Sequence, residues 1–299
     1  MRKNRWKSKL GSPLLAVGLA AVAIGSSVSA LAAETGGKLL LTGGVSQVEG
    51  AAGGGLTPWA FIGGYGTDNE IGGNAFATVV DTGDFRLKTW GALIGIHDRV
   101  EFSYAEQRFD TLDAGAKLGI GQGFTFTQDV YGIKVRVAGD GVLEQDRWMP
   151  QISVGLQHKK NNRGGLVRAL GAKDDSGTDY YVTATKLILD HSLLLNGTVR
   201  MTKANQMGIL GFGGDKSSGY KAQTEVSAAW LLSKSVAIGA EYRTKPDNLS
   251  FAKEDDWFDV FVAWAPTKNV SLTMAYVDLG DIATFKKQRG AYASVQIGF

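Results

Sequence analysis

The chain has 299 residues, with 41 glycines, 5 prolines and no cysteine. The absence of cysteine excludes thiolate catalysis, cysteine-based zinc sites and disulfide bonds. The 32 Lys and Arg residues exceed the 29 Asp and Glu residues only slightly, so charge makes no case for nucleic acid as a partner.

Residues 1–32 have the three-part organisation of a secretory signal peptide. Five basic residues lie among the first nine, an apolar stretch follows at residues 14–24, and Ala30-Leu31-Ala32 supplies small residues for cleavage. The apolar stretch is short for a membrane anchor. We expect cleavage after Ala32, with Ala30 as the alternative. Removal of this leader leaves 27 basic and 29 acidic residues, a net charge near −2.

Residues 33–56 form a Gly-rich segment with only a short apolar patch at Leu39–Leu41. Glycine permits many backbone conformations, so this composition does not decide how the segment is placed. Two interpretations remain open: a plug inside the lumen of a barrel, or a flexible periplasmic leader in front of it.

From residue 57 onward, apolar and polar residues alternate in segments that predict β-strands. There are about twelve, each near the ~9–11 residues that a tilted strand needs to cross a bilayer. Short turns such as Asp98-Arg99 and Ser233-Lys234 alternate with long polar or Gly-rich loops, which include residues 67–85. The predicted strands span residues 57–66, 86–97, 99–109, 126–138, 149–160, 178–189, 192–204, 220–232, 235–244, 256–265, 269–279 and 290–299.

The lengths of these connections favour a membrane barrel over a soluble sandwich. Short turns at one end and long loops at the other are typical of an outer-membrane barrel. A closed barrel also satisfies every backbone donor and acceptor in hydrocarbon. We therefore predict an all-β protein: an antiparallel transmembrane β-barrel of about 12 strands over residues 57–299, with both termini periplasmic. A soluble all-β protein with solvated charged faces is the alternative.

Aromatic residues fall at two levels of the predicted apolar faces. Trp230, Trp264 and Phe299 lie near the ends joined by turns, and Tyr181 and Tyr242 lie toward the ends joined by loops. Amphipathic rings at two levels are typical of interfacial girdles, because one edge of the ring stays wet while its body lies in lipid.

The polar faces of the same strands carry charges of both signs, which we expect to point into the barrel. A twelve-stranded barrel lies between the filled eight-stranded size and the open sixteen-stranded porins. Its lumen could therefore conduct a solute or be closed by charge pairs. The candidate lumen-lining residues are Glu101, Lys134, Arg136, Lys186, Arg200, Glu225, Glu241, Arg243 and Asp259.

Two apolar Gly-rich loop segments, residues 118–124 and 207–214, are expected either to fold inward or to lie on the outer leaflet. Catalysis finds little support. His97 and His191 fall in predicted periplasmic turns, and His158 adjoins a basic rim without a nucleophile-elbow spacing. We expect no catalytic residue, no cofactor and no metal site, and we interpret the acidic loop clusters as solvated charge.

The segment Gly290–Phe299 alternates to the end of the chain, with Val295 and Ile297 on the apolar face and Tyr292 on the other. It resembles the terminal strand of Gram-negative outer-membrane β-barrels, which ends in Phe and is read by the barrel-insertion machinery. The resemblance implies Tyr292, Val295, Ile297 and Phe299 as the insertion signal. It also implies the outer membrane as the location, and outer-membrane lipid, lipopolysaccharide and the barrel-assembly machinery as partners.

The segment Gly54–Thr67, followed by the barrel pattern, is similar to a proteobacterial family of functionally uncharacterised outer-membrane proteins. That resemblance covers most of the mature chain and implies location and architecture only. The main functional hypothesis is a narrow channel or transporter for a small solute. A non-conducting structural or surface-interaction barrel is the second hypothesis, and a lipid-modifying outer-membrane enzyme is the weakest.

Overall fold

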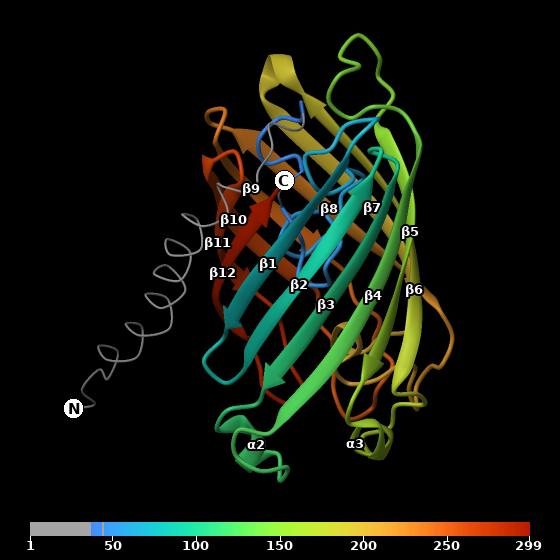
Figure 1. The fold of residues 1–299 in the computed structure, drawn as a ribbon. Coiled ribbons are helices and arrows are strands. Elements are labelled where there is room, and N and C mark those ends of the chain that lie inside the picture. The colour runs from blue at the N-terminus through green and yellow to red at the C-terminus, as the bar shows by residue number, and fades with distance from the viewer. Residues whose placement is uncertain (1–36, 44) are drawn as a thin grey trace, which may run out of the picture.

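Twelve antiparallel strands close into a single barrel in the computed structural model, which describes residues 37–43 and 45–299 (Figure 1). The predicted signal peptide lies outside the described residues. The strands are β1 (Ile71–Asp81), β2 (Arg86–Ile96), β3 (Val100–Asp110), β4 (Thr125–Ala138), β5 (Gln151–Asn161), β6 (Ser176–Ile188), β7 (Leu193–Thr202), β8 (Lys221–Leu231), β9 (Val236–Arg243), β10 (Trp257–Thr267), β11 (Val270–Asp278) and β12 (Arg289–Gly298).

Pairing of the first and last strands closes the barrel. Each strand pairs with its neighbours in sequence, and β1 pairs with β12 from Asn74–Gly298 to Asp81–Ala291. The backbone N of Phe299 also donates to the Gly73 carbonyl oxygen over 2.9 Å. Closure leaves the barrel without an unpaired strand edge, which is what a sheet in hydrocarbon requires.

The connections at one end of the barrel are mostly longer than those at the other, as expected, and the exceptions are the short connection 82–85 and the long connection 139–150. The turn end carries the connections 97–99, 139–150, 189–192, 232–235 and 268–269, together with the carboxy-terminus and the short helix η1 (Leu189–His191). The loop end carries residues 82–85, 111–124, 162–175, 203–220, 244–256 and 279–288. Within these loops lie α2 (Ala114–Lys117), α3 (Gly164–Ala169) and η2 (Gln206–Gly208). No helix in the described part of the chain is long and apolar enough to span a membrane.

The predicted strand at residues 57–66 is wrong, and so is the predicted start of the barrel at residue 57. Those residues lie inside the barrel, and the first strand is β1, within the stretch 67–85 that was expected to be a loop. The apolar run at Trp59–Ile62 resembles a strand because it is buried in the lumen. The Gly-rich start of β1 shows little alternation of apolar and polar residues, so this strand was not recognised. The predicted count of twelve strands is confirmed, since one strand too many at residues 57–66 is offset by the missed strand β1.

The outer face of the barrel is apolar. In β10, Phe258, Val260, Val262 and Trp264 are exposed and alternate with buried residues. On neighbouring strands, the rings of Trp90 and Tyr131 each contact Tyr104, with centroids 5.9 and 5.3 Å apart. A continuous apolar band of this kind needs lipid or another apolar cover, and on a closed barrel it is typical of a membrane-spanning wall. The predicted antiparallel barrel of twelve strands is confirmed, and the periplasmic location of its termini stays a prediction.

The aromatic residues follow the predicted two levels with one exception. Trp230, Trp264 and Phe299 are exposed toward the turn end, and Tyr242 is exposed toward the loop end. Tyr181 is buried instead, with the Arg200 guanidinium 5.2 Å from its ring centroid. Two consecutive tyrosines made the strand parity ambiguous, and it is Tyr180 that faces outward.

We predict that Val262→Arg, at the middle of the outer face of β10, lowers the free energy of unfolding by about 2–4 kcal/mol, because the guanidinium would lie at mid-bilayer depth. Urea titration of the protein in phospholipid vesicles measures this change. Thr224→Arg, on an outward position near the loop end of β8, is the control and should cost about 1 kcal/mol or less. Equal costs at both positions would contradict a lipid-covered wall.

Candidate functional site

The interior of the barrel is occupied by residues 45–66, here called the plug, and every residue of this segment is buried. In Figure 1 it is the blue coil inside the strands near the carboxy-terminus. The Gly64 N donates to the Gly43 carbonyl oxygen over 2.6 Å, and the Tyr65 N donates to that of Phe299 over 2.9 Å. The plug is therefore one loop that enters and leaves the barrel at the turn end. Of the two interpretations of the Gly-rich segment, the structure supports the plug.

Glycine is required where the plug backbone passes close to the wall. A Cβ on Gly54 would lie 1.9 Å from a carboxylate oxygen of Glu241, and Gly50 has a φ of +96°. Within the plug, Val48 N donates to the Gly55 carbonyl oxygen over 3.0 Å, and Trp59 N to that of Ala52 over 3.1 Å. The high glycine content thus permits a folded loop in close contact with the wall, rather than a flexible linker.

Neutral side chains of the wall bind the backbone of the plug. The carbonyl oxygen of Pro58 accepts hydrogen bonds from Thr183, Asn196 and Thr198 at 3.1–3.2 Å. The Ala60 carbonyl accepts two more such bonds. The wall residues that bind plug carbonyls in this way are Gln107, Gln151, Ser153, Gln157, Thr183, Asn196, Thr198 and Gln296. Because each net hydrogen bond contributes about 1 kcal/mol, the plug is held by many weak contacts.

The ion pair Glu101–Lys134, with 3.1 Å between Oε2 and Nζ, is completed by plug backbone. Lys134 donates to the carbonyl oxygens of Ala52 at 3.1 Å and Trp59 at 3.0 Å. Glu101 accepts from the N of Ala52 at 3.1 Å and of Gly63 at 2.8 Å. Both buried charged groups therefore form hydrogen bonds with the plug backbone in addition to their ion pair.

A second group of charges surrounds the only acidic side chain of the plug, Glu49. One carboxylate oxygen of Glu49 bonds Lys159 Nζ. The other lies 2.7 Å from Arg243 Nη1 and 3.7 Å from Arg200 Nη2. Glu49 thus reaches three cations, which project from β5, β7 and β9.

Wall carboxylates complete this group, here called the central cluster: Glu49, Lys159, Asp179, Arg200, Glu225 and Arg243. Lys159 Nζ lies 2.6 Å from Asp179, and Arg200 Nε lies 2.5 Å from Glu225. The cluster holds three cations and three anions, all nearly inaccessible to solvent. Removing one partner of a buried ion pair typically lowers the free energy of unfolding by about 3–5 kcal/mol. The opposite charges of the wall therefore hold Glu49 in place.

Glu241 and Asp259 form a carboxyl pair without a cation. Glu241 accepts from Leu56 N and Thr57 Oγ1, both at 2.6 Å, and from Ser227 Oγ at 2.9 Å. Asp259 pairs with Glu241 in register across β9 and β10, and neither of its oxygens has a hydrogen-bond partner in the described chain. The wall cations described above form their ion pairs with other carboxylates. Two carboxylates without a compensating cation repel each other in the interior of the barrel.

The structure places seven of the nine candidate residues inside the barrel and the other two at the turn end. Arg136 Nη1 lies 2.6 Å from Asp98, which also binds Lys38 Nζ at 2.6 Å. Lys186 Nζ donates to the Glu144 carbonyl oxygen, 2.5 Å away in the connection 139–150. Both residues stabilise the turn end. Arg136 has the inward parity of β4, whereas Lys186 has the outward parity of Tyr180 and Val182 on β6 and does not line the lumen as predicted. The seven others are Glu101, Lys134, Arg200, Glu225, Glu241, Arg243 and Asp259.

Sequence reasoning missed three members of the central cluster. Glu49 lay in a segment whose composition left its placement open. Lys159 was grouped with Lys160 as a basic rim, although outward Val154 and His158 show that odd-numbered positions there point inward. Asp179 was missed because the parity of β6 was misassigned at Tyr181. Strict alternation along β5 could have identified Lys159, whereas nothing local identifies Glu49.

The loop end is closed by residues 203–213, which fold inward, so one of the two expectations for segment 207–214 is met. The carbonyl oxygen of Met207 accepts from Gln128 at 3.1 Å and that of Ile209 from Asn161 at 2.7 Å. Phe212 is fully buried. The inward fold covers the loop-end side of the plug with apolar residues.

A buried ion pair fixes the neighbouring loop. Lys245 Nζ lies 2.9 Å from Glu254, and both contact Gln206. Burial lowers the pKa of Lys245, and the Glu254 carboxylate partly offsets that effect. Burial likewise raises the pKa of Glu254 against the opposing effect of Lys245. The pair therefore ties the 244–256 loop to the inward-folded segment.

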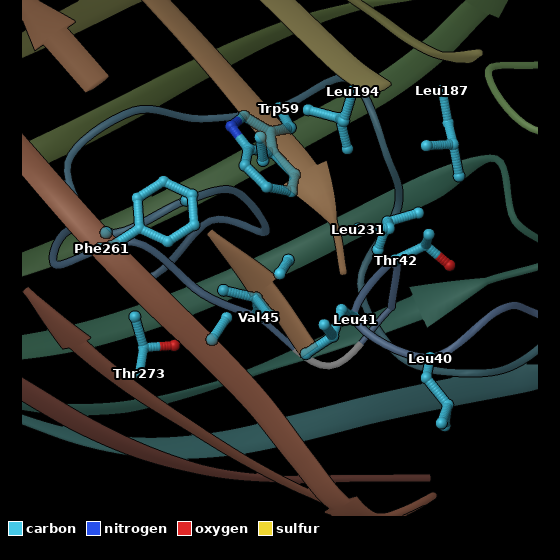
Figure 2. A pocket seen from close by; sticks show the side chains of 15 residues that line it. Leu40, Leu41, Thr42, Val45, Trp59, Leu187, Leu194, Leu231, Phe261 and Thr273 are labelled. Carbon is cyan, nitrogen blue, oxygen red and sulfur yellow. The ribbon is translucent and has the colours of Figure 1, made fainter. Parts of the chain in front are cut away.

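Two small apolar cavities lie in the described part of the interior. One, of about 30 Å³, lies between the plug and the wall, with Leu41, Val45, Trp59 and Phe261 among its lining residues (Figure 2). Another, of about 50 Å³, lies at the loop end against residues such as Phe126. Each has room for little more than a water molecule and offers it few polar partners. Neither forms a solute path.

The predicted insertion-signal residues divide between the two faces of β12. Tyr292 is buried in the interior, whereas Phe299 is exposed at the turn end. Val295 and Ile297 pair with the outward-facing Ala77 and Ala75. Their recognition by insertion machinery stays a prediction.

The three histidines lie apart from the lumen. His158 is exposed on the outer face of β5, with its Nδ1 3.0 Å from Thr178 Oγ1. His97 and His191 lie in turn-end connections.

Together these features define a membrane-spanning β-barrel of the outer-membrane type, with an apolar exterior and a polar lumen occupied by its own chain. The chain belongs to the family described as "Protein of unknown function (DUF3034)", which matches residues 42–296. This agrees with the resemblance to an uncharacterised family. No curated protein matches the chain in sequence.

Among solved structures, the chain is similar to a NanC porin at 8% identity and a TM-score of 0.49, over 76% of this chain and 98% of that chain. It is also similar to a KdgM porin in complex with disordered oligogalacturonate, at 9% identity and 0.48, over 76% and 99%. The outer membrane phospholipase A from Escherichia coli follows at 10% identity and 0.41, over 80% and 94%. At these values we draw nothing on function from them.

We predict that Glu241→Gln lowers the free energy of unfolding by about 2–3 kcal/mol, because an amide cannot accept hydrogen bonds from every donor that the carboxylate serves. Asp259→Asn should be neutral or stabilising, because it removes a buried carboxylate that has neither a cation nor a hydrogen-bond partner in the described chain. Denaturant titration in detergent micelles at pH 7 compares the two. A larger loss for Asp259→Asn than for Glu241→Gln would contradict this expectation.

Proposed function

We propose that this protein is a narrow outer-membrane channel or transporter for a small polar solute, and that the plug closes it. In the closed state described here, residues 45–66 occupy the path. Opening requires the plug to withdraw through the turn end, where both of its ends lie. In the expected orientation, with the turn end in the periplasm, withdrawal is toward the periplasm.

The observation that carries this proposal is the polarity of the wall where it meets the plug. The inward side chains there are mainly Thr, Ser, Asn, Gln and charged residues, and many bind backbone atoms of the plug. A permanent filler could be packed with apolar side chains at lower desolvation cost. A wall of hydrogen-bonding groups can exchange the plug for water or a polar solute, because each contact has an aqueous substitute.

A second candidate function, a non-conducting structural or surface-interaction barrel, is supported by the balanced central cluster and by the small remaining cavities. In that case the plug is a permanent part of the core. The two candidates differ in one measurable property, which is whether the plug moves while the barrel stays folded. Outer-membrane lipid and lipopolysaccharide are proposed partners of the apolar wall in either case, and we assign the protein no reaction.

We predict that excision of residues 45–62 produces a channel that conducts continuously in planar bilayers, because it removes most of the plug. Gly43 and Gly64 are already joined by a 2.6 Å hydrogen bond, so the shortened chain can be rejoined without moving β1. The intact protein should show only rare openings. An excised barrel that folds but conducts no more than the intact protein would refute the channel.

A disulfide between plug and wall tests the movement without deleting residues. The hydroxyl oxygens of Thr57 and Ser227 lie 2.5 Å apart, so Thr57→Cys with Ser227→Cys places two sulfurs within bonding range. The chain has no other cysteine. Oxidation should abolish openings and reduction should restore them, whereas the single variant Thr57→Cys should respond to neither. Openings that persist in the oxidised double variant would exclude plug movement as the gate.

A further inference from the structure

The side chain of Glu49 supplies a negative charge to the central cluster that the wall residues of the cluster do not supply. Without Glu49, the central cluster retains Lys159, Arg200 and Arg243 but only the carboxylates of Asp179 and Glu225. The cluster then holds one more cation than carboxylates. The three cations project from the strands β5, β7 and β9, so the barrel itself holds them together.

From this arrangement we infer that the wall carries a binding site for the carboxylate of a solute, and that Glu49 is an internal mimic of that solute. The inference rests on the proposed function, because the site becomes available only when the plug withdraws. A solute carboxylate that replaces Glu49 restores the charge balance. It therefore favours the open state over the closed one.

The geometry selects a carboxylate over a simple anion. The two oxygens of Glu49 bind different cations: one binds Lys159, and the other lies between Arg243 at 2.7 Å and Arg200 at 3.7 Å. A spherical ion such as chloride cannot contact both sides in this way. Planar two-oxygen groups are the natural partners of guanidinium donors.

Neutral donors extend the site beyond the charge. Gln157 Nε2 donates to the Glu49 carbonyl oxygen over 3.3 Å, and Gln157 Oε1 accepts from Arg200 Nη1 at 2.7 Å. Polar atoms of the solute adjacent to its carboxylate meet the same amide. The inferred ligand is thus a small carboxylate with neighbouring hydrogen-bonding groups.

Butyrate and butyramide are the matched probes. Butyrate reproduces the Glu49 side chain from its Cα outward, and butyramide has nearly the same shape but replaces one carboxylate oxygen by an uncharged NH2 group. The variant Val48→Cys places the sole thiol of the chain on a plug residue that is fully buried. The labelling rate of this thiol in the folded, detergent-solubilised protein measures plug withdrawal. We expect butyrate to accelerate labelling at least about threefold over butyramide and over potassium chloride of equal ionic strength.

Two further variants separate the inference from the proposed channel. In Val48→Cys with Glu49→Gln, labelling should be fast without any probe, because the internal carboxylate is gone. In the protein lacking residues 45–62, butyrate should reduce the chloride conductance and butyramide should not, and Lys159→Gln should weaken the butyrate effect. Equal behaviour of butyrate and butyramide in a conducting excised barrel would overturn the carboxylate site alone. A silent excised barrel would instead overturn the channel.

Discussion

Burial of charge inside a closed barrel is the constraint on which this structure depends. Hydrocarbon outside the wall requires apolar residues on the outward positions that it contacts and a sheet with no free edge. The inward positions are then left to polar residues, and twelve strands enclose more space than these side chains fill. The interior needs additional atoms that can satisfy charges and hydrogen bonds. Here residues 45–66 supply them.

The plug and the wall are matched in charge and in hydrogen bonding at separate levels of the lumen. Glu101 and Lys134 bind plug backbone on one side, and Glu49 enters a ring of three cations further along. Near Glu241 the plug contributes hydrogen-bond donors and no charged side chain. Apolar contacts at the turn end and the inward-folded loops at the other end enclose these polar levels. Such a plug is specific for its position in the lumen.

Most of the wall could be predicted because alternation with period two is a local property. Residues such as Val260 and Asp259 are adjacent in sequence and face lipid and lumen, respectively. The prediction failed where the local pattern was ambiguous. The run at Trp59–Ile62 has strand-like composition but lies in the lumen, and Tyr180-Tyr181 offered two possible parities. The Gly-rich start of β1 carried too little alternation to be recognised.

The sequence by itself determined the barrel, eleven of its twelve strands, the difference between its two ends and the inward direction of most charged residues. All of these follow from alternation and loop length along neighbouring residues. Only the tertiary structure decided that the Gly-rich segment lies inside, that Glu49 meets Lys159, Arg200 and Arg243, and that Glu241 and Asp259 remain without a cation. Glu49 contacts residues more than a hundred positions away, and such contacts exist only once closure brings the strands around one lumen.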